Sequence, residues 1–418
     1  MPDLLLPRPT RPASRQPRGS AGQQAVALLL GLLLALPNDD ASARDSTREP
    51  QPAQQASHRK DGASRNAQEG AKRKTAAPAR KAQAGKAAEA SRYAGHPGAE
   101  QLALEIAGRR GWELEWVRQW VGQAQQLPAV IRLSTPAPVA AAKNWAAYRA
   151  RFIEPSRIEA GRRFWLEQRA ALERAEIEYG VPAWLVVGII GVETLYGRHT
   201  GSFRVLDALA TLSLDFPASH PRAAERQAYF RTELEALLEL ARAQGLPPDA
   251  WRGSYAGAMG LPQFMPGSWL KYAVDFDGDG RVDLLNSPVD AIGSVAHYLR
   301  QHGWQPGMPT HYPVQVQAEG EALATLLAPD IKPSFDAARF HALGARLAEP
   351  ALRHAGPLAL VELRNGDPLQ GGSGPSYVAG TENFYAVTRY NWSSYYALAV
   401  IELGQAVQAA LNPPGAGR

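Results

Sequence analysis

The sequence predicts an α+β fold that is mainly α-helical, with a smaller β-rich insert at about residues 305–388. Two observations support this prediction. Between residues 98 and 244, apolar side chains recur at three- and four-residue steps, the spacing that places them on one face of a helix. After residue 305 the pattern changes to short alternating segments and glycine-rich turns, which are typical of strands and hairpins.

A series of helices is predicted in the first part of this region. They cover residues 98–127, 144–152, 157–179, 182–192, 204–214 and 226–244. The segment 182–192 is strongly apolar, and Pro182 stands near its first turn, where proline is favoured.

The predicted insert contains candidate strands at residues 311–316 and 355–363. Gly371 to Gly374, followed by residues 377–379, indicate hairpins nearby. Residues 383–388 are predicted to be a strand or irregular, and a helix over residues 393–411 closes the chain. The sequence contains no internal repeat.

The first 43 residues have the composition of an export signal. Four arginines between Arg8 and Arg18 precede an apolar run from Ala25 to Leu36, and residues 41–43 (Ala-Ser-Ala) provide the small residues of a cleavage site. A run of about a dozen apolar residues is a poor membrane span. We therefore favour a cleaved Sec-type signal over an uncleaved anchor, and we expect the mature protein in the periplasm.

Cysteine is absent from all 418 residues. The chain therefore has no disulfide, zinc–thiolate site or thiol nucleophile, and it is not a lipoprotein anchored through an acylated cysteine. An exported protein without disulfides depends on its core, or on another constraint such as a metal, for stability.

Residues 44–97 are predicted to form a disordered basic linker, because they contain almost no large apolar residue. Residues 44–92 carry a net charge of +7, whereas residues 93–418 carry −3. The basic character belongs to the linker, and nothing indicates a nucleic-acid-binding domain. The linker either makes weak electrostatic contact with the anionic wall or membrane or serves as a solvated tether.

Glu193 is the most informative residue, because this single carboxylate ends the apolar run that begins at Val186. Apolar surroundings disfavour the charged form, so we expect a raised pKa and a carboxyl group that stays protonated near neutral pH. A general acid that cleaves a glycosidic bond needs this property. A glutamate at a helix end is by itself more often solvated or salt-bridged, so the context has to decide.

Several motifs supply that context. Glu193 to Gly197 (ETLYG) resembles the catalytic signature of lysozyme-like transglycosylases, and Gly253 to Pro266 (GSYAGAMGLPQFMP) follows it. Residues 383–385 (NFY) and 389–391 (RYN) come further on. Together they resemble the lytic murein transglycosylase B family, glycoside hydrolase family 103. The resemblance runs from about residue 98 to 412 and implies a lysozyme-like catalytic domain over that range.

The resemblance also implies a reaction. The family cleaves the β-1,4 bond between N-acetylmuramic acid and N-acetylglucosamine in peptidoglycan glycan strands without consuming water. One glutamate, here Glu193, protonates the leaving oxygen and then acts as base on the muramyl C6 hydroxyl, which gives a 1,6-anhydro product. The N-acetyl group of the substrate stabilises C1, so a second enzymic carboxylate is not needed. We expect a monomer.

Seven further residues match positions that line the glycan cleft of the family: Tyr148, Ser254, Gln263, Phe264, Tyr390, Asn391 and Tyr396. The neutral polar groups among them can hold acetamido and hydroxyl groups without stabilising ionised Glu193. Tyr396 is equally compatible with a place in the core. Pro262 and Trp392 depart from the family, which often has glycine at the first position and arginine or histidine at the second; we expect these changes to retune the cleft.

An acidic loop at residues 275–283 (DFDGDGRVD) matches the first half of an EF-hand calcium loop. Its candidate ligands are the side chains of Asp275, Asp277 and Asp279 and the backbone carbonyl of Arg281. Asn286 stands where an EF-hand has its bidentate glutamate, so Asp290 is the candidate to close the site, as in the related family, where the loop is one residue shorter. The alternative is an Asp-Gly turn with a solvated acidic face. Because close carboxylates repel one another unless neutralised, we favour a structural Ca²⁺.

Two other functions remain open. A muramidase of the goose-lysozyme type would use water, and Asp207 or Asp215 would have to approach Glu193 to serve it. A non-catalytic glycan-binding protein would keep the fold alone. The sequence has no phosphate-binding loop, dinucleotide fingerprint, zincin motif or serine elbow, so we expect no organic cofactor.

Overall fold

The computed structural model describes residues 92–136, 143–367 and 371–411. The predicted export signal and most of the predicted linker lie outside these residues. The predicted linker extends to residue 97, but packed structure already begins at Arg92, which forms a β-bridge with Gln125. Tyr93 is buried, and its hydroxyl donates a hydrogen bond to Asp215. The folded part therefore starts earlier than predicted.

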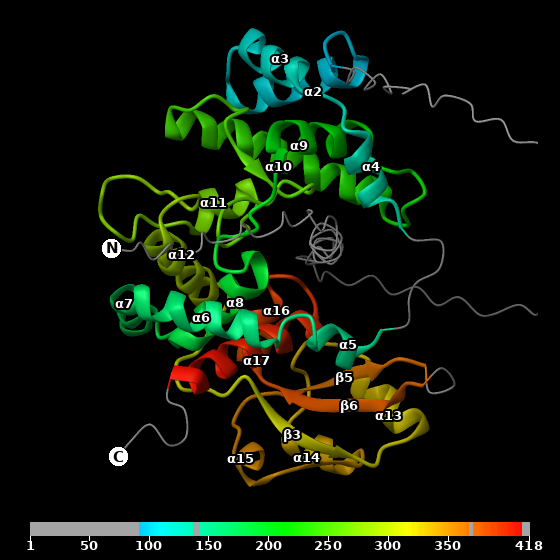
Figure 1. The fold of residues 1–418 in the computed structure, drawn as a ribbon. Helices are drawn as coiled ribbons and strands as arrows, with labels where there is room; N and C mark the ends of the chain where they lie inside the picture. The colour runs from blue at the N-terminus through cyan, green and yellow to red at the C-terminus, as the bar shows by residue number, and fades with distance from the viewer. Residues whose placement is uncertain (1–91, 137–142, 368–370, 412–418) are drawn as a thin grey trace, which may run out of the picture. The chain divides into compact units, whose positions relative to one another are not determined.

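The N-terminal helices are α2 (Pro97–Arg110), α3 (Leu114–Gln123) and α4 (Pro128–Ser134) (Figure 1). The single helix predicted over residues 98–127 is wrong, because the chain turns at Gly111. This glycine has a φ of 64° and ends α2 in the left-handed conformation that glycine adopts without strain. Arg109 and Arg110 of α2 form ion pairs with Glu235 on α10 (Ala223–Gln244), which packs against α9 (Val205–Leu214).

Helix α8 (Ala183–Thr194) is surrounded by other helices. Those that contact it are α6 (Pro155–Glu167), α7 (Arg169–Tyr179), α12 (Pro288–Gln301) and α17 (Ser394–Leu411). A Cβ atom on Gly188 would lie 2.2 Å from the carbonyl oxygen of Val400, and one on Gly404 would lie 2.0 Å from that of Trp184. Only glycine permits this approach, so α8 and α17 pack backbone against backbone.

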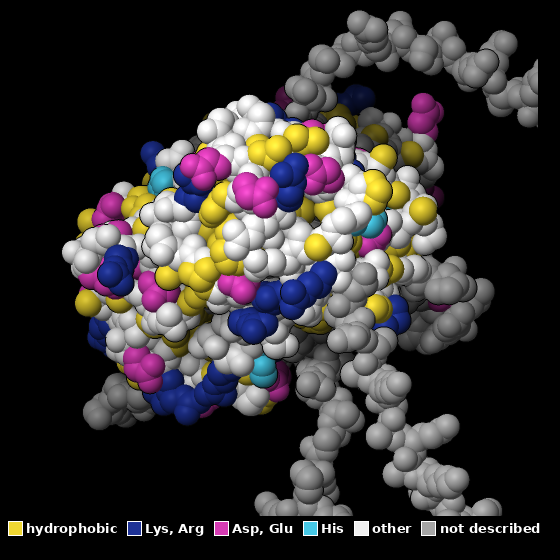
Figure 2. Space-filling view, turned by 90° about the horizontal axis from the view of Figure 1, so that it is seen from above, with side chains coloured by type: hydrophobic (Ala, Val, Ile, Leu, Met, Phe, Trp, Pro, Cys, Tyr) yellow, Lys and Arg dark blue, Asp and Glu magenta, His cyan; other side chains and the backbone are white. Residues whose placement is uncertain are grey.

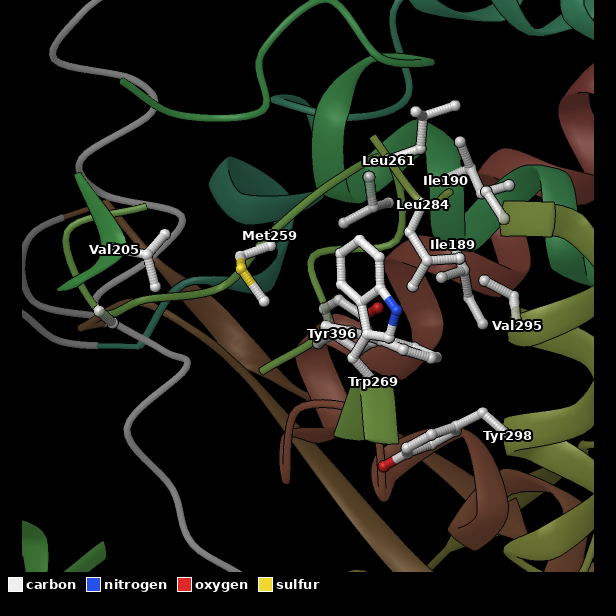
Figure 3. Packing of buried hydrophobic residues seen from close by; sticks show 14 of the residues in the cluster. Ile189, Ile190, Val205, Met259, Leu261, Trp269, Leu284, Val295, Tyr298 and Tyr396 are labelled. Atoms are coloured by element: carbon white, nitrogen blue, oxygen red, sulfur yellow. The ribbon is translucent and has the colours of Figure 1, made fainter. Parts of the chain in front are cut away.

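Burial on all sides explains why α8 is apolar on all of its faces. Figure 3 shows Ile189 and Ile190 in the same hydrophobic cluster as Leu261 and Leu284, which belong to the segments on either side of α11 (Pro266–Tyr272). Among the described residues, no single helix has the length and apolar composition to cross a membrane. Only α7 and α8 together, bent by 117°, meet that test.

The predicted β-rich insert contains a four-stranded antiparallel sheet of order β4–β3–β6–β5. Its strands are β3 (His311–Val316), β4 (Ala345–Leu347), β5 (Ala359–Asn365) and β6 (Ser373–Gly380). The helices of the insert are α13 (Gly320–Leu327), α14 (Ala337–Ala342) and α15 (Glu349–Leu352). Leu326, Phe340 and Leu358 belong to a small core that is separate from the one around α8.

Two further segments differ from the prediction. Residues 383–388 lie within helix α16 (Glu382–Thr388), because the Thr381 side chain accepts hydrogen bonds from the first backbone N–H groups and caps it. The helix predicted over residues 157–179 is divided at Gln168 into α6 and α7. The short elements α5 (Trp145–Arg149), β1 (Phe203–Arg204) and β2 (Arg252–Gly253) complete a fold that is rich in helix, as predicted.

Candidate active site

Glu193 lies in the last turn of α8, where the chain leaves the core. The next residues, Leu195 and Tyr196, have left-handed φ angles of 52° and 58°, a conformation that costs non-glycine residues on the order of 1 kcal/mol each or more. Thr194 holds this turn in place: its hydroxyl donates to the carbonyl oxygen of Leu261 (2.9 Å) and accepts from the N–H of Gly197 (3.0 Å). The helix end that carries Glu193 is thereby fastened to the segment 253–266.

The carboxyl group of Glu193 is half-buried and accepts a 2.6 Å hydrogen bond from the Tyr396 hydroxyl. Burial raises the pKa of Glu193 from its ordinary value of 4.5 to about 7, and the bond from Tyr396 partly offsets this rise. No charged side chain of the described residues contributes to this shift. Glu193 can therefore both give up and take up a proton near neutral pH. A residue that acts first as an acid and then as a base needs this property.

All three tyrosines predicted from the family resemblance converge on Glu193. They are Tyr148 of α5, Tyr390 from the turn between α16 and α17, and Tyr396 of α17. Burial raises the pKa of each hydroxyl, and the negative charge of Glu193 raises it further. The rings of Tyr390 and Tyr396 stack with their centroids 6.1 Å apart. Tyr396 is thus buried in the core, as one of its two predicted alternatives has it, and is also hydrogen-bonded to Glu193.

Gln263 and Ser254 form part of the loop opposite the end of α8. Gln263 has a φ of 52°, and its side-chain amide donates to the carbonyl oxygens of Thr200 (3.1 Å) and Gly260 (2.9 Å). Its amide oxygen accepts no hydrogen bond from the described residues, so it remains free as an acceptor. The Ser254 hydroxyl accepts from the N–H groups of Ala258 (3.0 Å) and Ala256 (3.3 Å), which fixes the turn around it.

Phe264 and Tyr390 join this loop to the C-terminal helices. Phe264 is buried with its ring 5.9 Å from that of Tyr390, and the Tyr390 hydroxyl donates to the carbonyl oxygen of Pro262 (2.6 Å). Pro262, one of the two departures from the family, therefore supplies an acceptor through its backbone, which a glycine would also supply.

Asn391 and Trp392 follow Tyr390 directly. Asn391 is buried, and its Oδ1 is an acceptor that the described residues leave unused. Trp392, the second departure from the family, adopts a φ of 33° and packs its ring against Tyr385 and the Arg389 guanidinium.

The two aspartates considered as second carboxylates are bound elsewhere. Asp207 accepts hydrogen bonds from Arg204 (2.7 Å) and from the N–H of Gln125 (2.9 Å). Asp215 accepts hydrogen bonds from the hydroxyl of Tyr93 (2.5 Å) and from the side-chain amide of Gln126, which precedes α4. Neither contributes to the pKa of Glu193. The structure thus brings neither of them to Glu193.

The acidic loop lies between α11 and α12. Oxygens of Asp275, Asp277 and Asp279 all lie within 4.8 Å of one another, which is close enough for them to share one cation. A set of carboxylate oxygens at this separation suits a hard cation such as Ca²⁺. Arg281 belongs to the same loop, and its N–H donates to Asp279 (2.9 Å).

Asp290, the predicted closing ligand, is not one of this group of three. It is buried, and its carboxylate accepts hydrogen bonds from the backbone N–H groups of Phe276 (2.8 Å), Asp277 (3.2 Å) and Asp283 (2.7 Å). Burial raises the pKa of Asp290, and the charge of nearby Asp277 adds to this effect. Asp290 therefore holds both ends of the loop and lies close to one of the three aspartates.

Two residues of the site were not among those predicted. Thr194 lies within the predicted catalytic motif (residues 193–197) but was not assigned a role, although its position directly after Glu193 was a usable signal. Tyr298 of α12 packs its ring against Phe264 and Tyr390, at centroid distances of 5.6 and 4.9 Å. Nothing in the sequence around Tyr298 distinguishes it from a core tyrosine, so only the fold reveals it.

Known proteins that resemble this chain all point to one family. The family model of the transglycosylase SLT domain matches residues 95–405. Membrane-bound lytic murein transglycosylase B of Escherichia coli K12 is 40% identical over 326 residues, which are 76% of this chain and 84% of that protein. A structure of the E. coli lytic transglycosylase Slt35 in complex with calcium is 39% identical and has a TM-score of 0.64, covering 76% of this chain and 95% of its own. For Pseudomonas aeruginosa SltB3 in complex with NAG-anhNAM-pentapeptide, the identity is 28%, the coverage 74% and 78%, and the TM-score 0.59. On these matches, the chain belongs to the transglycosylase SLT domain family.

Proposed function

We propose that this protein is a peptidoglycan lytic transglycosylase that cleaves the β-1,4 bond between N-acetylmuramic acid and N-acetylglucosamine. The observation that carries the proposal is the environment of Glu193: a half-buried carboxyl group with a pKa of about 7 and a neutral hydrogen-bond partner. Membership of the family, and a relative named as a lytic murein transglycosylase, support the same reaction.

The reaction uses Glu193 twice. Protonated Glu193 gives its proton to the glycosidic oxygen while the bond from that oxygen to C1 of the muramyl residue breaks. The resulting carboxylate then takes the proton of the C6 hydroxyl, and O6 bonds to C1 to give a 1,6-anhydromuramyl end. Glu193 loses one proton in the first step and gains one in the second, so it is regenerated and no water is consumed. The Tyr396 hydroxyl stabilises the carboxylate between the two steps.

Product analysis tests this reaction against hydrolysis. Purified peptidoglycan is digested and the muropeptides are examined by mass spectrometry; anhydro ends are lighter than hydrolysed ends by one water. We expect anhydro ends from the wild type and no products from Glu193→Gln. Hydrolysed ends would establish a muramidase. Undigested peptidoglycan, bound equally well by wild type and Glu193→Gln, would establish a non-catalytic binding protein.

We assign the binding of sugar groups to the seven residues predicted for the cleft. The free oxygen of Gln263 and the unused Oδ1 of Asn391 are acceptors for N–H and O–H groups of the glycan. Tyr148, Tyr390 and Tyr396 provide ring faces and hydroxyls around Glu193, whereas Phe264 and Ser254 shape the wall beside them. Each assignment rests on position near Glu193 or on the loop that is bonded to its helix.

We also assign a structural Ca²⁺ to the acidic loop. The side chains of Asp275, Asp277 and Asp279 would hold it, with the carbonyl oxygen of Arg281 and with Asp290 closing the site. The calcium complex of Slt35 supports this assignment by similarity. In a chain without cysteine, such an ion would join α11 to α12 in place of a covalent cross-link.

The remaining proposals concern the cellular context. We assign an export signal to residues 1–43, a basic linker to residues that follow it, and the catalytic domain to the range up to residue 412. An E. coli relative named as membrane-bound supports an enzyme that works at the cell wall. Cell fractionation tests the location of the protein. N-terminal sequencing of the mature protein tests the cleavage site.

A further inference from the structure

A row of tryptophans lies on helix α3 and the turn before it, outside the site described above. Trp112, Trp116 and Trp120 are spaced four residues apart, so they share one side of the helix, and each is half-buried. α3 packs on α2, whereas the helices that contact α8 are α6, α7, α12 and α17. This row therefore belongs to a different part of the fold from Glu193.

A pocket of about 300 Å³ adjoins this row. Trp116 and Trp120 form one wall, and the chain just after α10, including Leu246 and Pro247, forms the other. Leu246 is 47% exposed, so this apolar wall is open to an incoming molecule. Figure 2 views the molecule from the side of α2 and α3; hydrophobic side chains there lie among acidic and basic ones rather than in one broad apolar patch. Such a surface suits a ligand that is itself part apolar and part polar.

Arg242 supplies the polar part of the pocket. Its guanidinium lies 4.9 Å from the ring centroid of Trp116 and 5.2 Å from that of Trp112, and these cation–π contacts fix the rings. The side chain is exposed and has no carboxylate partner among the described residues, since Glu239, one turn earlier on α10, pairs with Arg110. The N–H groups at its edge are therefore available to oxygen atoms of a ligand.

We propose that this pocket binds a saccharide unit of the peptidoglycan glycan strand, as a second glycan site remote from the catalytic cleft. A pyranose ring presents C–H groups on its faces and hydroxyls on its rim. The faces match the tryptophan and proline wall, and the rim matches Arg242. The inference rests on the proposed function, because a polymeric substrate can reach two sites at once. Two contacts on one strand raise the affinity for long strands and leave that for short fragments unchanged.

Binding to purified insoluble peptidoglycan tests the inference. The assay uses a Glu193→Gln background, which prevents cleavage. There we expect Trp120→Leu to lower the affinity measured by sedimentation by about fivefold or more. This decrease is a modest part of the gain in affinity that two linked binding sites can give. Trp165→Leu on α6 is the matched control, since Trp165 is also a half-buried tryptophan packed on the core but lies outside the pocket. Arg242→Gln removes an exposed guanidinium from the same pocket, and it should lower the affinity in the same direction.

Chain length separates this site from the cleft. With Glu193 intact, Trp120→Leu should cleave a soluble four-sugar muropeptide at the wild-type rate and insoluble peptidoglycan more slowly. If Trp120→Leu and Arg242→Gln bind peptidoglycan as tightly as Trp165→Leu, the inference is overturned. If the wild type cleaves neither substrate, the proposed function fails instead, and the two failures are distinct.

Discussion

Replacing Glu193 by Gln removes an ionisable group from the edge of the core and keeps its shape. The amide oxygen of Gln can still accept the hydrogen bond from the Tyr396 hydroxyl. The extra amide N–H groups change stability by an amount that does not depend on pH. Any difference between wild type and Glu193→Gln that varies with pH therefore reports the ionisation of Glu193 itself.

The size and direction of this variation follow from linkage between protonation and folding. The pKa of Glu193 is about 7 in the folded protein, against 4.5 for the unfolded chain. Because the folded pKa is raised, the stabilising contribution of the neutral form is complete below pH 4.5 and is lost as the pH rises through 7. A difference of about 2.5 pKa units corresponds to roughly 3 kcal/mol. Glu193→Gln avoids this loss. The free energy of unfolding of Glu193→Gln should therefore rise by about 3 kcal/mol relative to that of the wild type when the pH is changed from acid to alkaline.

Urea denaturation of both proteins at about pH 4 and about pH 8.5 measures this gain, since these values bracket the two pKa values. The two stability differences are compared, so effects of pH on all other groups cancel. Glu173→Gln, which alters an exposed glutamate of α7, serves as the control for the substitution alone. A stability difference that stays constant across this pH range would mean that Glu193 is not buried enough to act as described.

Three further outcomes are expected. Tyr396→Phe removes the hydrogen bond that lowers the pKa of Glu193, so the alkaline limb of kcat/KM against pH should move up by about one unit, and an unmoved limb would contradict this role. Calcium should raise the melting temperature by a few degrees and Asp277→Asn should abolish the rise; equal melting with calcium and with chelator would show that the loop binds none. Thr194→Val leaves the buried Leu261 carbonyl oxygen without its donor, which should cost about 1–3 kcal/mol in urea denaturation and lower kcat; unchanged values would show that the turn is held by other contacts.

The helical class and the insert were predictable because hydrophobic spacing is a local property of the chain. The breaks at Gly111 and Gln168 were not predicted, because the apolar pattern continues across both of them. Helix α16 was missed for a related reason: its start depends on the Thr381 cap, whereas its residues alone suit a strand equally well. Local patterns thus identified the elements better than their boundaries.

For the site, the environment of Glu193 was predictable from the sequence, whereas its partners in space were not. The burial of Glu193 was predictable from the apolar run before it, and its raised pKa follows from that burial alone. Its hydrogen bond with Tyr396 joins residues that are 203 positions apart, so no spacing rule reaches it, and only the family resemblance indicated that tyrosine. Asp207 and Asp215 illustrate the reverse, because they follow Glu193 closely in sequence yet bind Arg204 and Tyr93 instead.

The separation of charge from Glu193 is itself part of the chemistry. A cation beside Glu193 would lower its pKa and leave it ionised, unable to protonate the glycosidic oxygen. A second carboxylate would raise the pKa further and weaken protonated Glu193 as the donor to the glycosidic oxygen, and it would also offer water a second base. Because no charged side chain of the described residues contributes to the pKa of Glu193, two opposing effects remain: burial raises it and the Tyr396 hydroxyl lowers it. Their balance near 7 allows one residue to give a proton and take one back.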